Sequence, residues 1–125
     1  MDKAQCNFKI LLIEDSESFR EAVSLMLGVY NDVDGVGSLE LARQLLGRRP
    51  YDVIILDRCL PDGDGIEFIS EIKRESQNTV VIMVTNDKDF SSIKKSISAG
   101  ADDYVVKTDN IAADLLIRIP TAVAR

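Results

Sequence analysis

Charged and hydroxyl side chains follow directly after runs of apolar residues at four points of this chain. Glu14 and Asp15 follow 8–13, Asp57 follows 51–56, Thr85 follows 79–84, and Lys107 follows 101–106. Carboxylates prefer hard divalent cations such as Mg²⁺, and a carboxylate can also accept a phosphoryl group. An ammonium and a hydroxyl supply the cation and hydrogen bond that a transferred phosphoryl group needs. Together these residue types suit metal-assisted phosphoryl chemistry.

The position of these residues supports one shared site. Taken singly, an acid or a threonine after a strand is usually a helix cap or a turn residue. In an open parallel sheet, however, the carboxyl ends of the strands lie at one edge, where ligands bind. Five such residues at matching strand ends therefore predict a common site.

The expected chemistry centres on Asp57. Crowded carboxylates repel one another, and a bound Mg²⁺ removes that repulsion. We expect Asp15 and Asp57 to ligate the ion directly and Glu14 to act through water. Asp57 is the predicted phosphoryl acceptor, Lys107 supplies a second cation, and Thr85 donates a hydrogen bond to a phosphoryl oxygen.

The segment LPDGDG after this strand predicts a turn that bends the backbone over the site. Pro61, Gly63 and Gly65 are the residues that shape it. In that turn the backbone carbonyl of Cys59 is expected to be a further metal ligand.

Strands and helices are predicted to alternate along the whole chain. The predicted strands are 8–13, 31–38, 51–56, 79–84 and 101–106. Helical spacing of apolar residues marks 16–28, 38–47, 64–75, 88–99 and 110–119, and Pro120 is expected to kink or stop the last helix. Such alternation predicts an α/β fold with a doubly wound parallel sheet and right-handed crossovers.

Composition excludes several classes of protein. The chain has 125 residues, of which 46% are hydrophobic, as in a soluble single domain rather than a disordered chain. No apolar run is long enough to span a membrane, no secretory signal is present, and a cytoplasmic location is expected. The net charge of −6 argues against direct nucleic-acid binding, and the absence of histidine removes imidazole chemistry. Cys6 and Cys59 are expected to be free thiols.

The sequence resembles the receiver domains of response regulators in two-component signalling. The likeness covers about 8–119 and is carried by LLIEDS, LDRCLPDGDG, VIMVT and AGADDYVVK. It implies a flavodoxin-like fold with five strands in the order 2-1-3-4-5 and five helices. It also implies Mg²⁺-dependent phosphoryl transfer to Asp57 from a sensor histidine kinase or a phosphotransfer protein, since this chain has no histidine of its own.

The resemblance also implies how a signal leaves the domain. Thr85 would move toward the phosphoryl group and Tyr104 would turn inward. These changes would alter the surface of the fourth helix, fifth strand and fifth helix, which a downstream effector domain or protein recognises. Such a domain is a regulatory module rather than an enzyme, and it catalyses only its own phosphorylation and slow dephosphorylation.

Some positions depart from the commonest family pattern. Asn86 replaces a small residue after the threonine, and Thr108 replaces a proline after the lysine. Cys59 and Asp87 occupy positions that, in the family, tune the rate of dephosphorylation. We expect residues 1–125 to form a single receiver domain, as the N-terminal piece of a longer multidomain protein.

Three other functions are compatible with parts of the pattern. A flavodoxin-like cofactor binder needs a phosphate loop after the first strand, where EDSESF is acidic. A haloacid-dehalogenase-like phosphatase wants a second acid two residues after Asp57, where Cys59 stands. The third is a receiver-fold interaction module that signals without phosphorylation, which Asn86 and Thr108 keep open.

Overall fold

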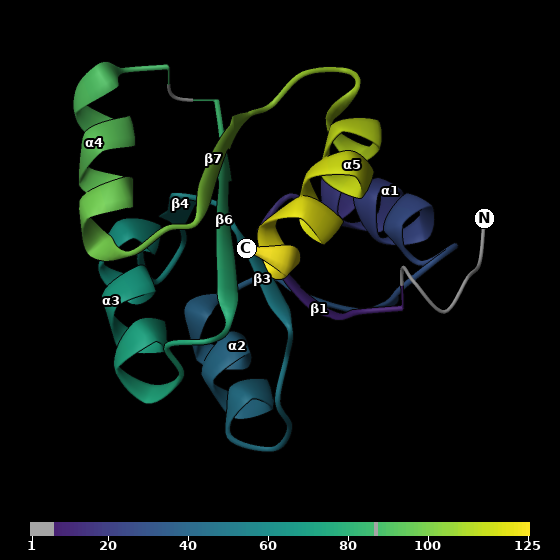
Figure 1. Ribbon diagram of the computed structural model, residues 1–125, viewed down its shortest axis with the longest axis horizontal. Helices are drawn as coiled ribbons and strands as arrows, with labels where there is room; N and C mark the ends of the chain where they lie inside the picture. Colours follow the sequence, from purple (N-terminus) through teal and green to yellow (C-terminus); the bar gives the residue numbers. More distant parts are fainter. Residues whose placement is uncertain (1–6, 87) are drawn as a thin grey trace.

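The computed structural model describes residues 7–86 and 88–125 of the chain. These residues form a five-stranded parallel sheet with helices packed against it (Figure 1). The spatial strand order is β2-β1-β3-β6-β7, and every neighbouring pair is parallel. Counted along the chain within this sheet, the order is the predicted 2-1-3-4-5. The strands are β1 (Lys9–Ile13), β2 (Asp32–Val36), β3 (Val53–Leu56), β6 (Val80–Thr85) and β7 (Asp103–Val106).

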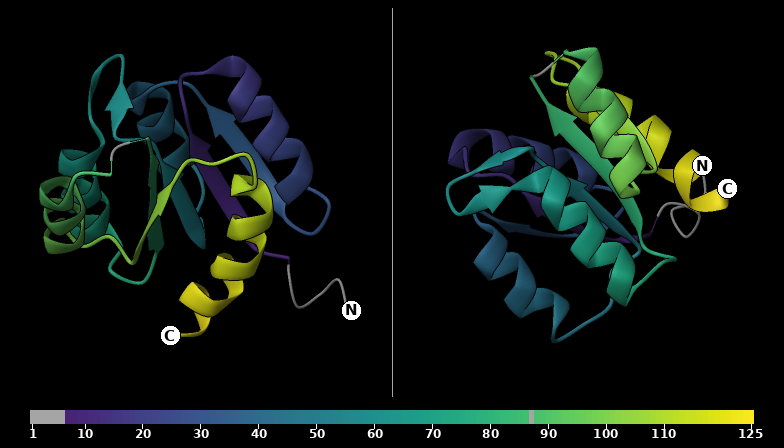
Figure 2. Two further views of the ribbon diagram at one scale, coloured as in Figure 1. Left: turned by 90° about the horizontal axis from the view of Figure 1, so that it is seen from above. Right: turned by 90° about the vertical axis from the view of Figure 1, so that its left-hand side faces the viewer.

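Within the described residues, four helices connect the strands and a fifth follows the last strand, and together they cover both faces of the sheet (Figures 1 and 2). One apolar cluster joins α1 and α5 to the sheet, and a second joins α2 and α3 to the opposite face, with α4 against α3. Alternate residues of β1 belong to the two clusters, since Ile10 and Leu12 lie in one and Leu11 and Ile13 in the other. The helices are α1 (Glu17–Leu27), α2 (Leu39–Leu46), α3 (Gly65–Glu75), α4 (Phe90–Ala99) and α5 (Ile111–Ala124).

The sequence predicts the last helix over 110–119, with Pro120 expected to kink or stop it, but the helix does not stop there and continues to Ala124. Proline lacks an N–H and removes one helical hydrogen bond, which is the reason for expecting an end at residue 119. The expectation is wrong because the last turn contributes to the core. Ile119 and Ala122 are both buried there, and Val123 packs against the same cluster.

A short hairpin lies between β3 and α3, where the sequence predicts only a turn. Strands β4 (Cys59–Leu60) and β5 (Gly63–Asp64) pair antiparallel, and Asp64 then caps α3 by accepting the N–H of Ile66. Gly65 brings the end of this hairpin back against the end of β3, where its N–H donates to the carbonyl of Arg58 at 2.7 Å.

Among the described residues, no helix is both long and apolar enough to cross a bilayer.

The close approach of Gly65 to the backbone at the end of β3 predicts that Gly65→Ala destabilises the domain. A Cβ at residue 65 would lie 2.3 Å from the carbonyl oxygen of Asp57, closer than real contacts allow. We expect the free energy of unfolding in urea to fall by about 1–3 kcal/mol. Gly47→Ala is the control, because its Cβ would meet ordinary contacts, the nearest at 3.5 Å. Equal unfolding midpoints for the two variants would contradict the prediction.

Candidate functional site

The four predicted strand ends meet at one edge of the sheet. Backbone hydrogen bonds continue one residue past the strands, since the N–H of Asp57 donates to the carbonyl of Ile13 at 3.1 Å. On the other side, the N–H of Lys107 donates to the carbonyl of Thr85 at 2.9 Å. Hydrogen bonds of the sheet therefore position the backbones of Asp57, Thr85 and Lys107 independently of their side-chain contacts.

The ammonium of Lys107 lies between two buried carboxylates. Its Nζ is 2.5 Å from Oε1 of Glu14 and 3.3 Å from Oδ2 of Asp57. Burial alone lowers the pKa of Lys107, but the hydrogen bond to Glu14 and the charge of Asp57 outweigh burial and raise the pKa above its ordinary value. The group is therefore a cation at neutral pH, and the two carboxylates hold it in place.

Glu14, Asp15 and Asp57 form an acidic group that fits a divalent cation. Each offers a carboxylate oxygen, and these atoms all lie within 4.8 Å of one another. A magnesium ion with ligands at about 2.1 Å places neighbouring ligand oxygens about 3–4 Å apart, so small side-chain movements would suffice. All three donors are hard oxygens, which suits Mg²⁺ rather than a thiolate- or imidazole-binding metal.

The remaining predicted site residues lie in β6, in β7 and in the hairpin that follows β3. Thr85 ends β6 and is buried, while Tyr104 in β7 is half-buried and packs against the cluster that contains α2 and α3. Cys59 opens the hairpin as an exposed free thiol. Their proposed roles, including a metal bond from the Cys59 carbonyl, stay predictions. Cys6 and Asp87 lie outside the described residues.

Three contacts that the sequence did not predict tie the site to its helices. The carboxylate of Asp62 accepts the N–H groups of Leu39 and Glu40 at the start of α2, at 2.9 and 3.0 Å, and these bonds lower the pKa of Asp62. Arg58, next to Asp57, donates to the hydroxyl of Ser92 in α4. These contacts span 23 and 34 residues, and the local sequence patterns carry no sign of them.

The third contact is aromatic. The ammonium of Lys107 lies over the ring of Phe19, 4.5 Å from its centroid. Phe19 is in the first turn of α1, where helical spacing predicts only a core residue. Both residues line an open hollow of about 370 Å³ at the mouth of the site, together with Ser16, Asn86, Thr108 and Asp109.

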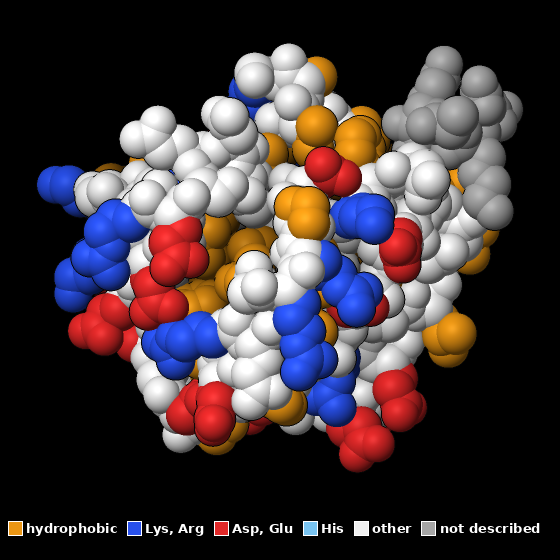
Figure 3. All heavy atoms as spheres, turned by 90° about the horizontal axis from the view of Figure 1, so that it is seen from below, with side chains coloured by type: hydrophobic (Ala, Val, Ile, Leu, Met, Phe, Trp, Pro, Cys, Tyr) orange, Lys and Arg blue, Asp and Glu red, His pale blue; other side chains and the backbone are white. Residues whose placement is uncertain are grey.

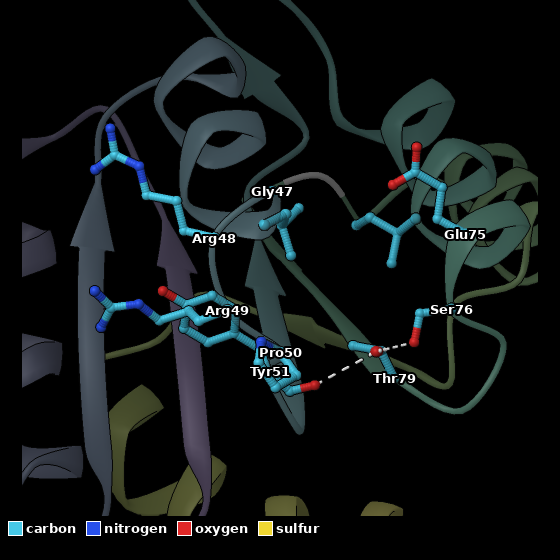
Figure 4. A pocket seen from close by; sticks show the side chains of 10 residues that line it. Gly47, Arg48, Arg49, Pro50, Tyr51, Glu75, Ser76 and Thr79 are labelled. Carbon is cyan, nitrogen blue, oxygen red and sulfur yellow. Dashed lines mark hydrogen bonds between the residues drawn. The ribbon is translucent and has the colours of Figure 1, made fainter.

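A larger hollow of about 420 Å³ lies at the opposite end of the sheet, before β3 and β6 (Figure 3). Hydrophobic side chains form its floor between charged ones in that view. The hydroxyls of Ser76 and Thr79 pair with each other, and Thr79 also donates to the Tyr51 carbonyl (Figure 4). Arg49 extends from the rim toward Asp34 in β2. The hollow is thus separate from the acidic group and has its hydroxyls already paired.

The sheet order and the acidic group at its carboxyl edge define a flavodoxin-like α/β protein with a cation-compatible site. Comparison with known protein families identifies the family within this class. Residues 10–118 match the family model described as the response regulator receiver domain. The chain therefore belongs to the receiver-domain family of two-component response regulators, and this membership favours the receiver function over a flavodoxin-like cofactor binder or a haloacid-dehalogenase-like phosphatase.

Individual relatives agree with the family match. The response regulator protein PilR of Pseudomonas aeruginosa is 30% identical over 122 residues, which cover 91% of this chain and 27% of PilR. The KDP operon transcriptional regulatory protein KdpE of Escherichia coli is 36% identical over 121 residues, covering 93% of this chain and 51% of KdpE. This chain thus spans a quarter to a half of the length of these two relatives.

Solved structures show the same fold. The BeF3-activated receiver domain of DrrB, a response regulator of Thermotoga maritima, superimposes with a TM-score of 0.85 at 33% identity. The match covers 95% of this chain and 99% of that domain.

The position of Lys107 between two carboxylates predicts that the stability of the Lys107→Met variant depends on magnesium. Without the ammonium, Glu14 and Asp57 remain close and uncompensated, so we expect a loss of about 1–3 kcal/mol in EDTA. Added Mg²⁺ should raise the melting temperature of this variant more than that of the parent protein. Lys73→Met is the control, since Lys73 is similarly shielded but pairs with Asp102 at the other end of the sheet. An equal Mg²⁺ response in all three proteins would contradict the prediction.

Proposed function

We propose that this domain is a phosphoacceptor signalling switch in which Asp57 accepts a phosphoryl group from a partner's phosphohistidine. The observation that carries the proposal is the half-buried ammonium of Lys107 between the buried carboxylates of Glu14 and Asp57, in a chain that belongs to the receiver family. A carboxylate at the tip of a rigid buried strand is pre-positioned as a nucleophile, and the adjacent ammonium is positioned to stabilise the charge that develops during transfer.

The protein's own groups divide the work in the following way. Asp57 attacks phosphorus through a carboxylate oxygen, the bond from phosphorus to the donor nitrogen breaks, and the donor histidine keeps the electron pair. Lys107 then exchanges part of its contact with Asp57 for a phosphoryl oxygen, and the hydroxyl of Thr85 donates to another. A magnesium ion held by Glu14, Asp15 and Asp57 would neutralise the carboxylates and the incoming oxygens.

The domain is proposed to be regulatory, with chemistry limited to its own phosphorylation and slow dephosphorylation. Its proposed donors are a sensor histidine kinase or a phosphotransfer protein, and its proposed target is an effector domain or protein. We place this exchange in the cytoplasm, and we propose that residues 1–125 are the receiver part of a longer protein.

Incubation with Mg²⁺ and acetyl phosphate tests the central step. We expect intact mass spectrometry to show the gain of one phosphoryl group, and Asp57→Asn to show none. Glu71→Gln is the control, because Glu71 is a partly exposed carboxylate that pairs with Arg43 in α2, outside the acidic group. No gain in the parent protein despite Mg²⁺-dependent stabilisation would favour a receiver that signals without phosphorylation.

The proposed Mg²⁺ site can be tested separately with Asp15→Asn. Asp15 is exposed and belongs to the acidic group, so removing its charge relieves repulsion without opening the core. We expect unchanged or higher stability in EDTA, and a much smaller rise in melting temperature on adding Mg²⁺. Asp109→Asn is the control, because Asp109 lines the hollow beside Lys107 but lies outside the acidic group, and this variant should keep the full Mg²⁺ response.

The proposed output passes through Thr85 and Tyr104 to the surface formed by α4, β7 and α5. The half-buried packing of Tyr104 supports a side chain that can shift between two positions. Tyr104→Ala should leave phosphorylation intact and abolish its effect on partner binding. Partner affinity that still responds to phosphorylation in this variant would remove Tyr104 from the switch.

A further inference from the structure

The ammonium of Lys107 has three different neighbours, and one of them is uncharged. Two are the carboxylates of Glu14 and Asp57, and the third is the face of the Phe19 ring. An aromatic face attracts a cation through its quadrupole, and this attraction strengthens where water is excluded. The side chain of Lys107 is 15% exposed, so the ring acts on a partly desolvated charge.

The carboxylate that binds the ammonium also holds the start of the helix that carries the ring. Glu14 accepts the backbone N–H of Ser16 at 3.1 Å through Oε2, while its Oε1 contacts Lys107. Ser16 caps α1 by accepting the N–H of Phe19 at 3.4 Å. Phe19 also packs against the core cluster of α1 and α5. Glu14, the helix cap, the ring and the ammonium therefore form one closed set of contacts.

The two kinds of neighbour respond differently when a cation binds. Glu14 and Asp57 belong to the acidic group, so a bound divalent cation takes up part of the negative charge that holds Lys107. The Phe19 ring is uncharged, so a bound cation does not neutralise its attraction for the ammonium in the same way. It keeps its attraction for the ammonium at the moment when the carboxylates lose some of theirs.

We propose that Phe19 is a positioning residue that keeps the Lys107 ammonium beside Asp57 when a divalent cation occupies the acidic group. This inference rests on the proposed function, because it assigns Phe19 a part in phosphoryl transfer to Asp57. In this proposal Phe19 acts through its contact with Lys107.

Two substitutions separate the ring's electrostatic attraction from its bulk. Phe19→Leu keeps an apolar side chain in the first turn of α1 but removes the aromatic face. Phe19→Tyr keeps the aromatic face and adds a hydroxyl at a position that lines the open hollow. Phe90→Leu is the control, since Phe90 is an exposed phenylalanine at the start of α4.

The first measurement is nuclear magnetic resonance of the full chain, with and without saturating Mg²⁺. In the parent protein and in Phe19→Tyr, the methylene protons next to Nζ of Lys107 should show an upfield ring-current shift that persists with Mg²⁺. In Phe19→Leu this shift should vanish, and added Mg²⁺ should move these resonances toward those of a solvated lysine. Resonances of Phe19→Leu that match the parent protein in both conditions would overturn the proposal.

The second measurement is the rate of phosphorylation by acetyl phosphate in saturating Mg²⁺. We expect Phe19→Leu to be about tenfold slower, with Phe19→Tyr and Phe90→Leu within about twofold of the parent protein. A Phe19→Leu rate equal to the parent rate, or a Phe19→Tyr rate as slow as that of Phe19→Leu, would also overturn it. Absence of phosphorylation in the parent protein would contradict the proposed function instead. The resonances of Lys107 alone would then show whether Phe19 holds the ammonium in place.

Discussion

The site depends on the half-buried ammonium of Lys107, which is held between two buried carboxylates. Burying a carboxylate without a partner is costly, and Glu14 and Asp57 are both buried at the carboxyl edge of the sheet. Lys107 offsets this cost from the end of β7, the strand at the far side of β6. Lys107 pairs with two of the three carboxylates of the acidic group, so the group still offers negative charge to a further cation. The arrangement is stable enough to fold and still electrostatically suited to a further cation.

The fold and the gathering of the strand ends at one edge could be predicted from the sequence, because its apolar patterns are strong. Continuous apolar runs such as VIIL allow few arrangements other than a strand covered on both faces, and helices of regular spacing between them leave one class of fold. Parallel strands then bring their carboxyl ends together. The residue order alone therefore places Asp15, Asp57 and Lys107 in one neighbourhood.

Contacts between side chains far apart in the sequence could not be predicted in the same way. The bond from Arg58 to Ser92 depends on where α4 packs, and the place of Phe19 over Lys107 depends on the angle at which α1 leaves the sheet. The length of α5 was mispredicted for a related reason. The local preference of Pro120 favours a helix end, and the burial of Ala122 in the core overrides it.

The bonds from Asp62 bear on how the domain reaches its folded state. Leu39 and Glu40 have backbone N–H groups that no earlier residue of their own helix can satisfy, and Asp62 accepts both from a hairpin 23 and 22 residues further along the chain. The first turn of α2 is therefore completed only after the segment following β3 has docked. In hydrogen exchange, these two amides should gain protection together with the hairpin, rather than with the rest of their own helix.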